Sequence, residues 1–289
     1  MRERASARAA RRAATERRFR ALALAALAMS IGCLLLLLGA VLWRGLGGLD
    51  WAFLTGADAT GPDRAGIGGA LVGSLMTLFV TLVLAVPIGV LAALWLEEFA
   101  PRDRWGDLIE VSINNLAAVP PIIFGLLGLA LFLNGFGMPR ASPLLAGLTL
   151  ALMTMPVVVI AARLAIRAVP QGLRDGAAAL GASRVQVTFH HVLPLALPGI
   201  LTGAIIGAAR ALGETAPLLL IGMQAFIPAA PRGPTEPATV LPVQIFLWSD
   251  EVDPGFVQRT SAAILVLLAL LVAMNGLAAW LRHRAERRA

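Results

Sequence analysis

Long apolar stretches alternate with short polar segments along the 289-residue chain. A transmembrane helix needs about 20 consecutive apolar residues to cross the hydrocarbon core of a bilayer. The stretches that meet this requirement are 21–43, 65–96, 111–139, 141–162, 192–231 and 260–281. This pattern predicts an all-α membrane protein with about six transmembrane helices.

Composition supports the membrane interpretation. Hydrophobic residues make up 58% of the chain and charged residues 14%, against about 25% charged residues in an ordinary soluble domain. The first apolar stretch is longer than the apolar region of a cleaved signal peptide, which has about 7–15 residues. We therefore expect an uncleaved anchor helix that follows an Arg-rich cytoplasmic tail.

The arginines predict the orientation of the helices. The chain has no Lys, and if its N-terminus is cytoplasmic, 18 Arg fall in inside segments and 5 in outside segments, with Arg210 left in the membrane. The positive-inside rule then places both termini in the cytoplasm. We expect the chain to cross the inner membrane of a bacterial cell several times. This distribution also explains the basic charge without a nucleic-acid partner, and membrane lipid is the surrounding partner that we expect.

The apolar pattern also predicts the organisation of the chain. Residues 1–64 form the tail, the anchor helix and a first outer loop; residues 65–284 form the core, with a cytoplasmic loop at 163–194; and residues 285–289 form a second cytoplasmic tail. Because a nucleotide-binding P-loop requires Lys, this chain has no ATP site of that kind. We expect no enzyme activity, no cofactor and no metal site.

The cytoplasmic loop between the fourth and fifth apolar stretches is longer than a simple connection requires. Pro170 is typical of a helix start and Gly181 of a helix stop, so we expect a short helix with a face of Ala177, Ala178 and Ala179. A second short helix follows at about 184–192. Docking of a partner explains this hairpin, and two helices lying on the membrane surface are the alternative.

Two charged residues interrupt the fifth apolar stretch. Arg210 and Glu214 are four residues apart, so they share one side of a helix. A charge at the centre of a membrane costs about 2.5–3.5 kcal/mol on insertion scales. The pair is either a self-neutralising structural pair or part of a substrate path. In a path, Arg210 attracts an anion, Glu214 holds Arg210 in place or weakens substrate binding, and Thr215 adds a hydroxyl donor.

The same stretch contains a small-residue pattern. Gly199, Gly203 and Gly207 are spaced four apart, which allows close approach of a neighbouring helix. We interpret this spacing as tight packing inside the membrane.

Two motifs carry a resemblance. Asp175-Gly-Ala followed by Gly181 and Leu193-Pro resembles the coupling motif of ABC importer permeases, with Asp for Glu and Gly for Ala at its first two positions. The segment 210–219, Arg-Ala-Leu-Gly-Glu-Thr-Ala-Pro-Leu-Leu, resembles the PstA-type permease of the phosphate ABC importer. Three further segments also resemble this family: 116–128, 193–203 and 244–248. The similarity covers about residues 65–284. Arg163-Leu164 departs from the acidic residues expected there, and we expect this departure to alter the partner surface near the loop.

The resemblance implies a type I ABC importer permease (MetI-like) fold and a phosphate importer. Its partners would be a second, PstC-like permease, two copies of an ATP-binding subunit and a periplasmic phosphate-binding protein. The ATPase coupling loop would use Asp175, Gly176, Ala177, Ala178 and Gly181. A PstC-like or sulfate/molybdate permease is the alternative, against which the Thr-Ala-Pro at 215–217 argues.

Overall fold

The computed structural model describes residues 2–101 and 103–286, with side chains for 16–101 and 103–284. Every regular element in these residues is helical, as predicted. The elements are α1 (Arg2–Gly45), η1 (Leu46–Gly48), α2 (Trp51–Thr55), α3 (Gly68–Leu94), η2 (Trp95–Phe99), α4 (Arg104–Ala117), α5 (Pro121–Gly128), η3 (Leu129–Gly135), α6 (Pro143–Arg167), α7 (Gln171–Ala179), α8 (Arg184–Val187), η4 (Thr188–Val192), α9 (Leu193–Gly213), α10 (Ala216–Leu220), α11 (Leu241–Ser249) and α12 (Gly255–Glu286). Residues 287–289 of the predicted C-terminal tail lie outside the described residues.

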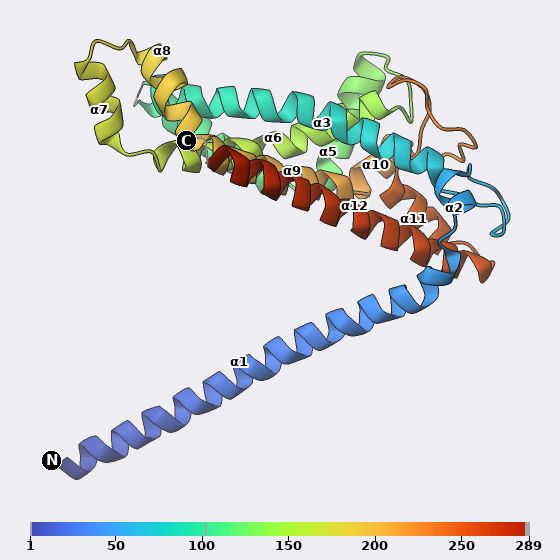
Figure 1. Ribbon diagram of the computed structural model, residues 1–289, viewed down its shortest axis with the longest axis horizontal. Coiled ribbons are helices and arrows are strands. Elements are labelled where there is room, and N and C mark those ends of the chain that lie inside the picture. Colours follow the sequence, from blue (N-terminus) through green and yellow to red (C-terminus); the bar gives the residue numbers. More distant parts are fainter. Residues whose placement is uncertain (1, 102, 287–289) are drawn as a thin grey trace.

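Four long helices, α3, α6, α9 and α12, form an elongated bundle (Figure 1). Helix α6 lies at its centre and packs against both α3 and α9, while α9 also contacts α12. In its most apolar window, 61% of α6 is buried by the rest of the chain. Helices α7 and α8 lie at one end of the bundle, and α2 and α11 lie at the other (Figure 1). With the predicted orientation, these are the cytoplasmic end and the outer end.

The glycines of α9 allow it to lie directly against α6. A Cβ atom added to Gly199 would lie 2.6 Å from the Cβ of Ala165, and one on Gly207 would lie 2.8 Å from the Cγ2 of Thr154. Gly203 meets Ala161 in the same way. Close backbone approach through small residues is a common way to join helices in a membrane, and the predicted packing role of these glycines is confirmed.

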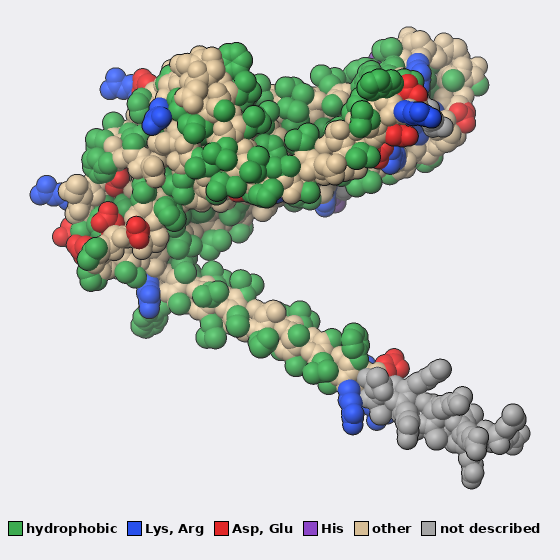
Figure 2. All heavy atoms as spheres, turned by 180° about the vertical axis from the view of Figure 1, so that it is seen from behind, with side chains coloured by type: hydrophobic (Ala, Val, Ile, Leu, Met, Phe, Trp, Pro, Cys, Tyr) green, Lys and Arg blue, Asp and Glu red, His purple; other side chains and the backbone are tan. Residues whose placement is uncertain are grey.

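Helix α1 stands apart from the bundle (Figure 1). It combines the predicted tail and anchor in one helix, and it packs against α12 and η1 near its C-terminal end. The rest of the chain buries none of its apolar window, and Figure 2 shows hydrophobic side chains around the helix. Apolar surface on every side of a helix requires lipid or another protein to cover it.

The third apolar stretch is not one straight span, so the prediction of a single helix over 111–139 is wrong. The chain forms α4 and then α5 with η3, and the two parts differ in direction by 100°. Pro120 and Pro121 lie at the break, where each removes a backbone donor and disfavours a helical residue before it. The described residues thus contain five long candidate spans, or six if the bent pair counts as one span.

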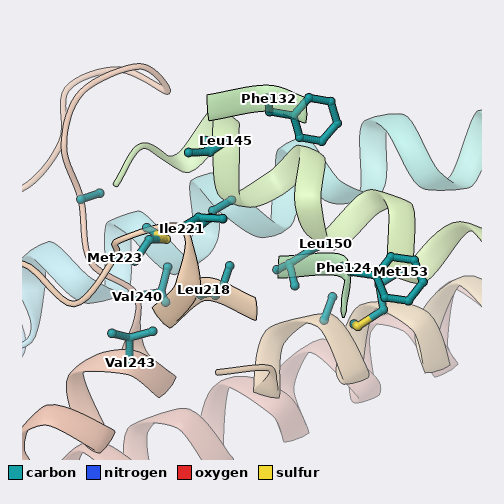
Figure 3. Close-up of a cluster of buried hydrophobic side chains, with 13 residues drawn as sticks. Phe124, Phe132, Leu145, Leu150, Met153, Leu218, Ile221, Met223, Val240 and Val243 are labelled. Carbon is teal, nitrogen blue, oxygen red and sulfur yellow. The ribbon is translucent and has the colours of Figure 1, made fainter. Parts of the chain in front are cut away.

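The fifth apolar stretch, predicted as one span over 192–231, also breaks. Helix α9 ends at Gly213, and Glu214 has extended backbone angles (φ −76°, ψ 131°). Pro217 then opens the short helix α10, after which residues 221–240 return to the outer half of the bundle. Buried side chains from α5, α6, α10 and this returning segment, among them Phe124, Leu150 and Leu218, form one cluster (Figure 3).

Candidate functional site

The predicted helix of the cytoplasmic loop is present. Helix α7 follows Pro170 and ends at Ala179. Gly181 has a φ of +87°, a left-handed conformation that glycine adopts without steric cost. These features confirm the helix start and stop that the sequence predicts.

The exposed face of α7 differs from the predicted alanine face. Asp175, Gly176, Ala178 and Gly181 are exposed at the end of the bundle, but Ala177 is 8% exposed and packs inward. Its neighbours in a buried cluster come from α3, α6 and α9. Ala177 therefore fixes α7 to the bundle, and it is not part of a surface that a partner can reach.

Large apolar side chains complete the exposed face of the loop. Leu173 is 48% exposed and Leu180 is 91% exposed. Exposed leucines beside small residues offer a shallow apolar surface for a partner protein.

The predicted second helix of the loop is not a separate element. Helix α8 continues through η4 into α9, which gives one helix of 30 residues, Arg184–Gly213. Ser183 starts it with a capping box, in which Ser183 accepts from the Gln186 backbone and Gln186 accepts from the Ser183 backbone. The hairpin prediction is wrong in this respect, because no turn signal separates residues 184–192 from the span that follows.

A network of charged side chains beside the loop was missed by the sequence reasoning. Arg163 of α6 donates from Nε to Glu97 Oε1 (2.6 Å) and from Nη2 to Glu110 Oε2 (2.6 Å). Arg167 donates from Nε to the other oxygen of Glu97 at 2.8 Å. The network joins η2, α4 and α6, and each of these hydrogen bonds connects residues that lie more than 50 positions apart along the chain.

The network corrects the expectation for position 163. Arg163 is 7% exposed, so it does not alter a partner surface, whereas its neighbour Leu164 is 62% exposed. The Arg163 guanidinium is turned into the chain, where Glu97 and Glu110 supply the acidic groups. The signal in the sequence was a charged pair, Glu97 and Glu98, directly after an apolar span, with Arg163 and Arg167 four apart after another.

Helix α7 contributes a second ion pair. Arg174 donates from Nε and Nη2 to Glu98 Oε1 at 3.2 and 3.1 Å. The same guanidinium donates to the carbonyl oxygens of Ile166 (2.8 Å) and Val169 (2.5 Å) beyond the end of α6. Arg174 thus satisfies carbonyl groups at a helix C-terminus, which otherwise have no partner within the helix.

The structure pairs Arg210 with Glu214, but the prediction that both lie on one helix is wrong, because α9 ends at Gly213 and Glu214 has an extended backbone. Arg210 Nε lies 3.4 Å from Glu214 Oε1. The Arg210 side chain is 41% exposed and that of Glu214 is 18% exposed. Thr215 is half-buried next to them, just past the end of α9. An exposed guanidinium on a transmembrane helix requires protein or water to cover it, since lipid cannot solvate it.

Helix register places this pair in the outer half of the bundle. Gly207 lies against Thr154, so Arg210, almost one turn further along α9, is level with α6 residues nearer Pro143 than Arg167. The contact of Ala211 with the cluster that contains Leu150 agrees. The pair and the cytoplasmic loop lie at opposite ends of one helix, about 40 Å apart at 1.5 Å per residue.

Residues 85–287 match the family of binding-protein-dependent transport system inner membrane components. Residues 6–55, which contain most of α1, match a separate domain of unknown function.

Curated relatives align over most of the chain. A probable ABC transporter permease protein, YqgI of Bacillus subtilis, is 30% identical over 83% of this chain and 86% of its own length. A probable phosphate transport system permease protein PstA of Methanocaldococcus jannaschii is 32% identical over 77% of this chain and 76% of its own. PstA 1 of Mycobacterium tuberculosis is 32% identical over 77% of this chain and 72% of its own.

Solved structures share the fold at lower identity. A chain of the MetNI methionine ABC transporter, in an inward-facing conformation, superposes with a TM-score of 0.61 at 18% identity, covering 76% of this chain and 95% of that one. A chain of an amino acid ABC transporter gives a TM-score of 0.57 at 19% identity, covering 75% and 92%. The MetI-like permease fold is therefore present here.

Proposed function

Since the chain belongs to the family of binding-protein-dependent transport system inner membrane components, we propose that it is the PstA-type permease subunit of an ATP-driven phosphate importer. In this role it forms half of a translocation pathway and transmits the action of a separate ATPase. The observation that carries the proposal is the exposed Arg210–Glu214 pair on a transmembrane helix, in a chain whose relatives include several PstA proteins.

The exposure of Arg210 supports a pathway shared with a second subunit. This chain alone leaves the guanidinium open on the side of α9 that also carries Ile206, which is 57% exposed. In the assembled importer a PstC-like permease covers this side, and the charged pair faces water or protein between the two subunits. Arg210 then offers an anion a positive charge and up to five hydrogen-bond donors.

Glu214 keeps the site from holding phosphate too tightly. While the site is empty, the carboxylate neutralises Arg210, and an entering anion must compete with it for the guanidinium. Thr215 lies beside the pair and supplies a hydroxyl group. The position of the pair in the outer half of the bundle suits a first contact for an anion that a periplasmic phosphate-binding protein delivers.

The exposed residues of the cytoplasmic loop support the docking of a separate ATPase subunit. Its exposed residues Asp175, Gly176, Ala178 and Gly181, with Leu180, form a surface at one end of the bundle. Two copies of an ATP-binding subunit would serve the two permeases, one on each loop. Since the chain has no Lys, it has no P-loop of its own, and hydrolysis belongs to those subunits.

Uptake of labelled phosphate tests the proposal. The importer is reconstituted in vesicles with its partner subunits, with sulfate and molybdate as competitors. Arg210→Ala and Glu214→Ala are each expected to lower uptake, Arg210→Ala by about ten- to hundredfold because hydrogen bonds to charged groups contribute about 1.5–3 kcal/mol. Wild-type uptake in both variants would remove the pair from the path.

Two controls separate charge from structure and test the substrate. Arg210→Lys keeps the positive charge but loses the planar guanidinium group. Its phosphate uptake is therefore expected to lie between that of the wild type and that of Arg210→Ala. Competition by sulfate or molybdate that equals competition by unlabelled phosphate would favour the alternative assignment to a permease for another oxyanion.

A further inference from the structure

The cytoplasmic end of α3 is the π-helical turn η2, on which Glu97 and Glu98 are adjacent but bind different arginines. Such turns are rare and often occur at functional sites. Glu97 binds Arg163 of α6, while Glu98 binds Arg174 of the coupling helix α7. One turn of α3 is therefore joined both to the span before the loop and to the loop itself.

The pair of Arg174 and Glu98 is largely removed from water. Their side chains are 15% and 10% exposed. Two guanidinium nitrogens bind one carboxylate oxygen, and the fork also donates to the carbonyl oxygens of Ile166 and Val169. Four hydrogen bonds hold the guanidinium group of Arg174. Because this group is rigid, α7, α6 and η2 can move little relative to one another. Loss of one partner would leave an uncompensated buried charge.

The segment of the loop that follows Gly181 also contacts η2. Arg184, the first residue of α8, places its guanidinium carbon 5.6 Å from the centre of the Phe99 ring. A guanidinium over an aromatic face at this distance is attracted by the ring. Residues on both sides of Gly181 therefore hold η2, although η2 lies more than 70 residues earlier in the chain.

We propose that Glu98 and Arg174 are positioning residues that make η2 a second attachment point of the coupling loop. Displacement of α7 by an ATPase then reaches α3 directly. It continues to α4 through Glu97, Arg163 and Glu110. Without this attachment, the movement would reach α6 and α9 through the covalent chain, and α3 only through the apolar cluster that contains Ala177. This inference rests on the proposed function, in which an ATPase docks on the loop.

The test measures phosphate uptake and ATP hydrolysis in the same vesicles, with the complete importer. Glu98→Gln keeps the size of the side chain and removes its charge. Uptake per ATP hydrolysed is expected to fall about two- to thirtyfold, the range for residues that carry coupling between sites, while hydrolysis continues. Asp107→Asn is the matched control, since Asp107 is an exposed carboxylate on α4 with no salt bridge in the described part of the chain.

Arg174→Gln is expected to lower the same ratio at least as much, because it also removes the hydrogen bonds to the carbonyl oxygens of Ile166 and Val169. The double variant is expected to have a ratio no lower than that of Arg174→Gln, because the contact of Glu98 with Arg174 is already lost there. Phe99→Leu removes the aromatic ring that Arg184 contacts and leaves no buried charge unpaired. It is expected to lower uptake per ATP hydrolysed less than Glu98→Gln does. An unchanged ratio in Glu98→Gln and Phe99→Leu would overturn the inference. Absence of phosphate uptake by the wild-type importer would instead count against the proposed function.

Discussion

The two ends of the bundle are held together by different interactions. At the cytoplasmic end, Arg163 and Arg174 reach across to Glu97 and Glu98 on a neighbouring helix. At the outer end, buried aromatic rings pack together, with ring centres of Trp248 and Phe256 5.8 Å apart. Figure 2 shows charged side chains gathered at both ends of the bundle. Among the side chains that the structure describes, only those at the cytoplasmic end form a network of ion pairs between helices.

The outer end uses its charges differently. Asp58 accepts from two neutral donors, Gln244 Nε2 at 3.1 Å and Trp248 Nε1 at 3.2 Å. Arg259 donates mainly to backbone carbonyl oxygens, those of Gly48, Pro62 and Asp63. These contacts fix loops on a packed core, whereas the cytoplasmic pairs join helices to one another. We infer that the outer end is the fixed part of this chain and that the cytoplasmic end passes on movement.

The largest effect on stability is expected from a substitution that disrupts the charged network at the cytoplasmic end. Arg163→Ala leaves Glu97 paired with Arg167 and leaves the half-buried Glu110 without its shortest contact. Breaking a buried ion pair costs about 3–5 kcal/mol when one charge is left without a partner, and because Arg167 remains we expect about 3 kcal/mol here. We expect the free energy of unfolding of the purified chain in detergent to fall by this amount. Denaturant titration measures the change.

The control for this variant restores neutrality. Addition of Glu97→Gln and Glu110→Gln to Arg163→Ala is expected to recover much of the loss, because the carboxylate charges that Arg163 neutralised are then absent. Arg104 is exposed, so Arg104→Ala measures the change in unfolding free energy when an arginine outside the network is removed. If Arg163→Ala costs no more than Arg104→Ala, the network does not hold this end together.

A smaller effect is expected at the outer end. Trp248→Phe keeps a buried aromatic ring but removes the donor to Asp58. A hydrogen bond to a charged group contributes about 1.5–3 kcal/mol, so the free energy of unfolding is expected to fall within this range. In an Asp58→Asn background the same change is expected to cost about 0.5–1.5 kcal/mol, the value for a neutral hydrogen bond. Equal costs in the two backgrounds would show that the carboxylate charge does not matter here.

The sequence predicts features set by local rules or by the bilayer. Apolar length located the spans, because a helix must match the hydrocarbon thickness. Pro170 and Gly181 bounded α7 through their backbone preferences. The close approach of Gly203 to α6 also followed from spacing alone. The spacing of Arg210 and Glu214 suggested a pair, but the helical repeat was not its cause, because Glu214 lies just past the end of α9.

Features that depend on distant contacts were not predictable in this way. The proline pair at 120–121 signals a break, but the 100° turn between α4 and α5 depends on how α5 packs against α10. The pairing of Arg163 with Glu97 joins residues 66 positions apart. Ala177 turns inward because the α3, α6 and α9 side chains that bury it come together only in the fold.

The smallest expected effect is the pH dependence of the outer end. Burial raises the pKa of Asp58 above its ordinary value of 3.8, and the charge of Glu251 acts in the same direction, against the hydrogen bonds from Gln244 and Trp248. A raised pKa means that the folded chain binds this proton more tightly than the unfolded chain does. The resulting stabilisation is fully present below 3.8 and is lost as the pH rises through the higher pKa of the folded state.

The difference in unfolding free energy between the wild-type chain and Asp58→Asn isolates this group, since other titrating residues act on both chains. As the pH falls from 7 toward 4, the wild type is expected to gain stability relative to the variant. A matching comparison with Asp107→Asn, whose carboxylate is exposed, is expected to show little trend. If the wild type instead loses stability relative to Asp58→Asn over this range, the hydrogen bonds outweigh burial at Asp58. The outer end would then depend on a charge as much as the cytoplasmic end does, and the contrast between the two ends would fail.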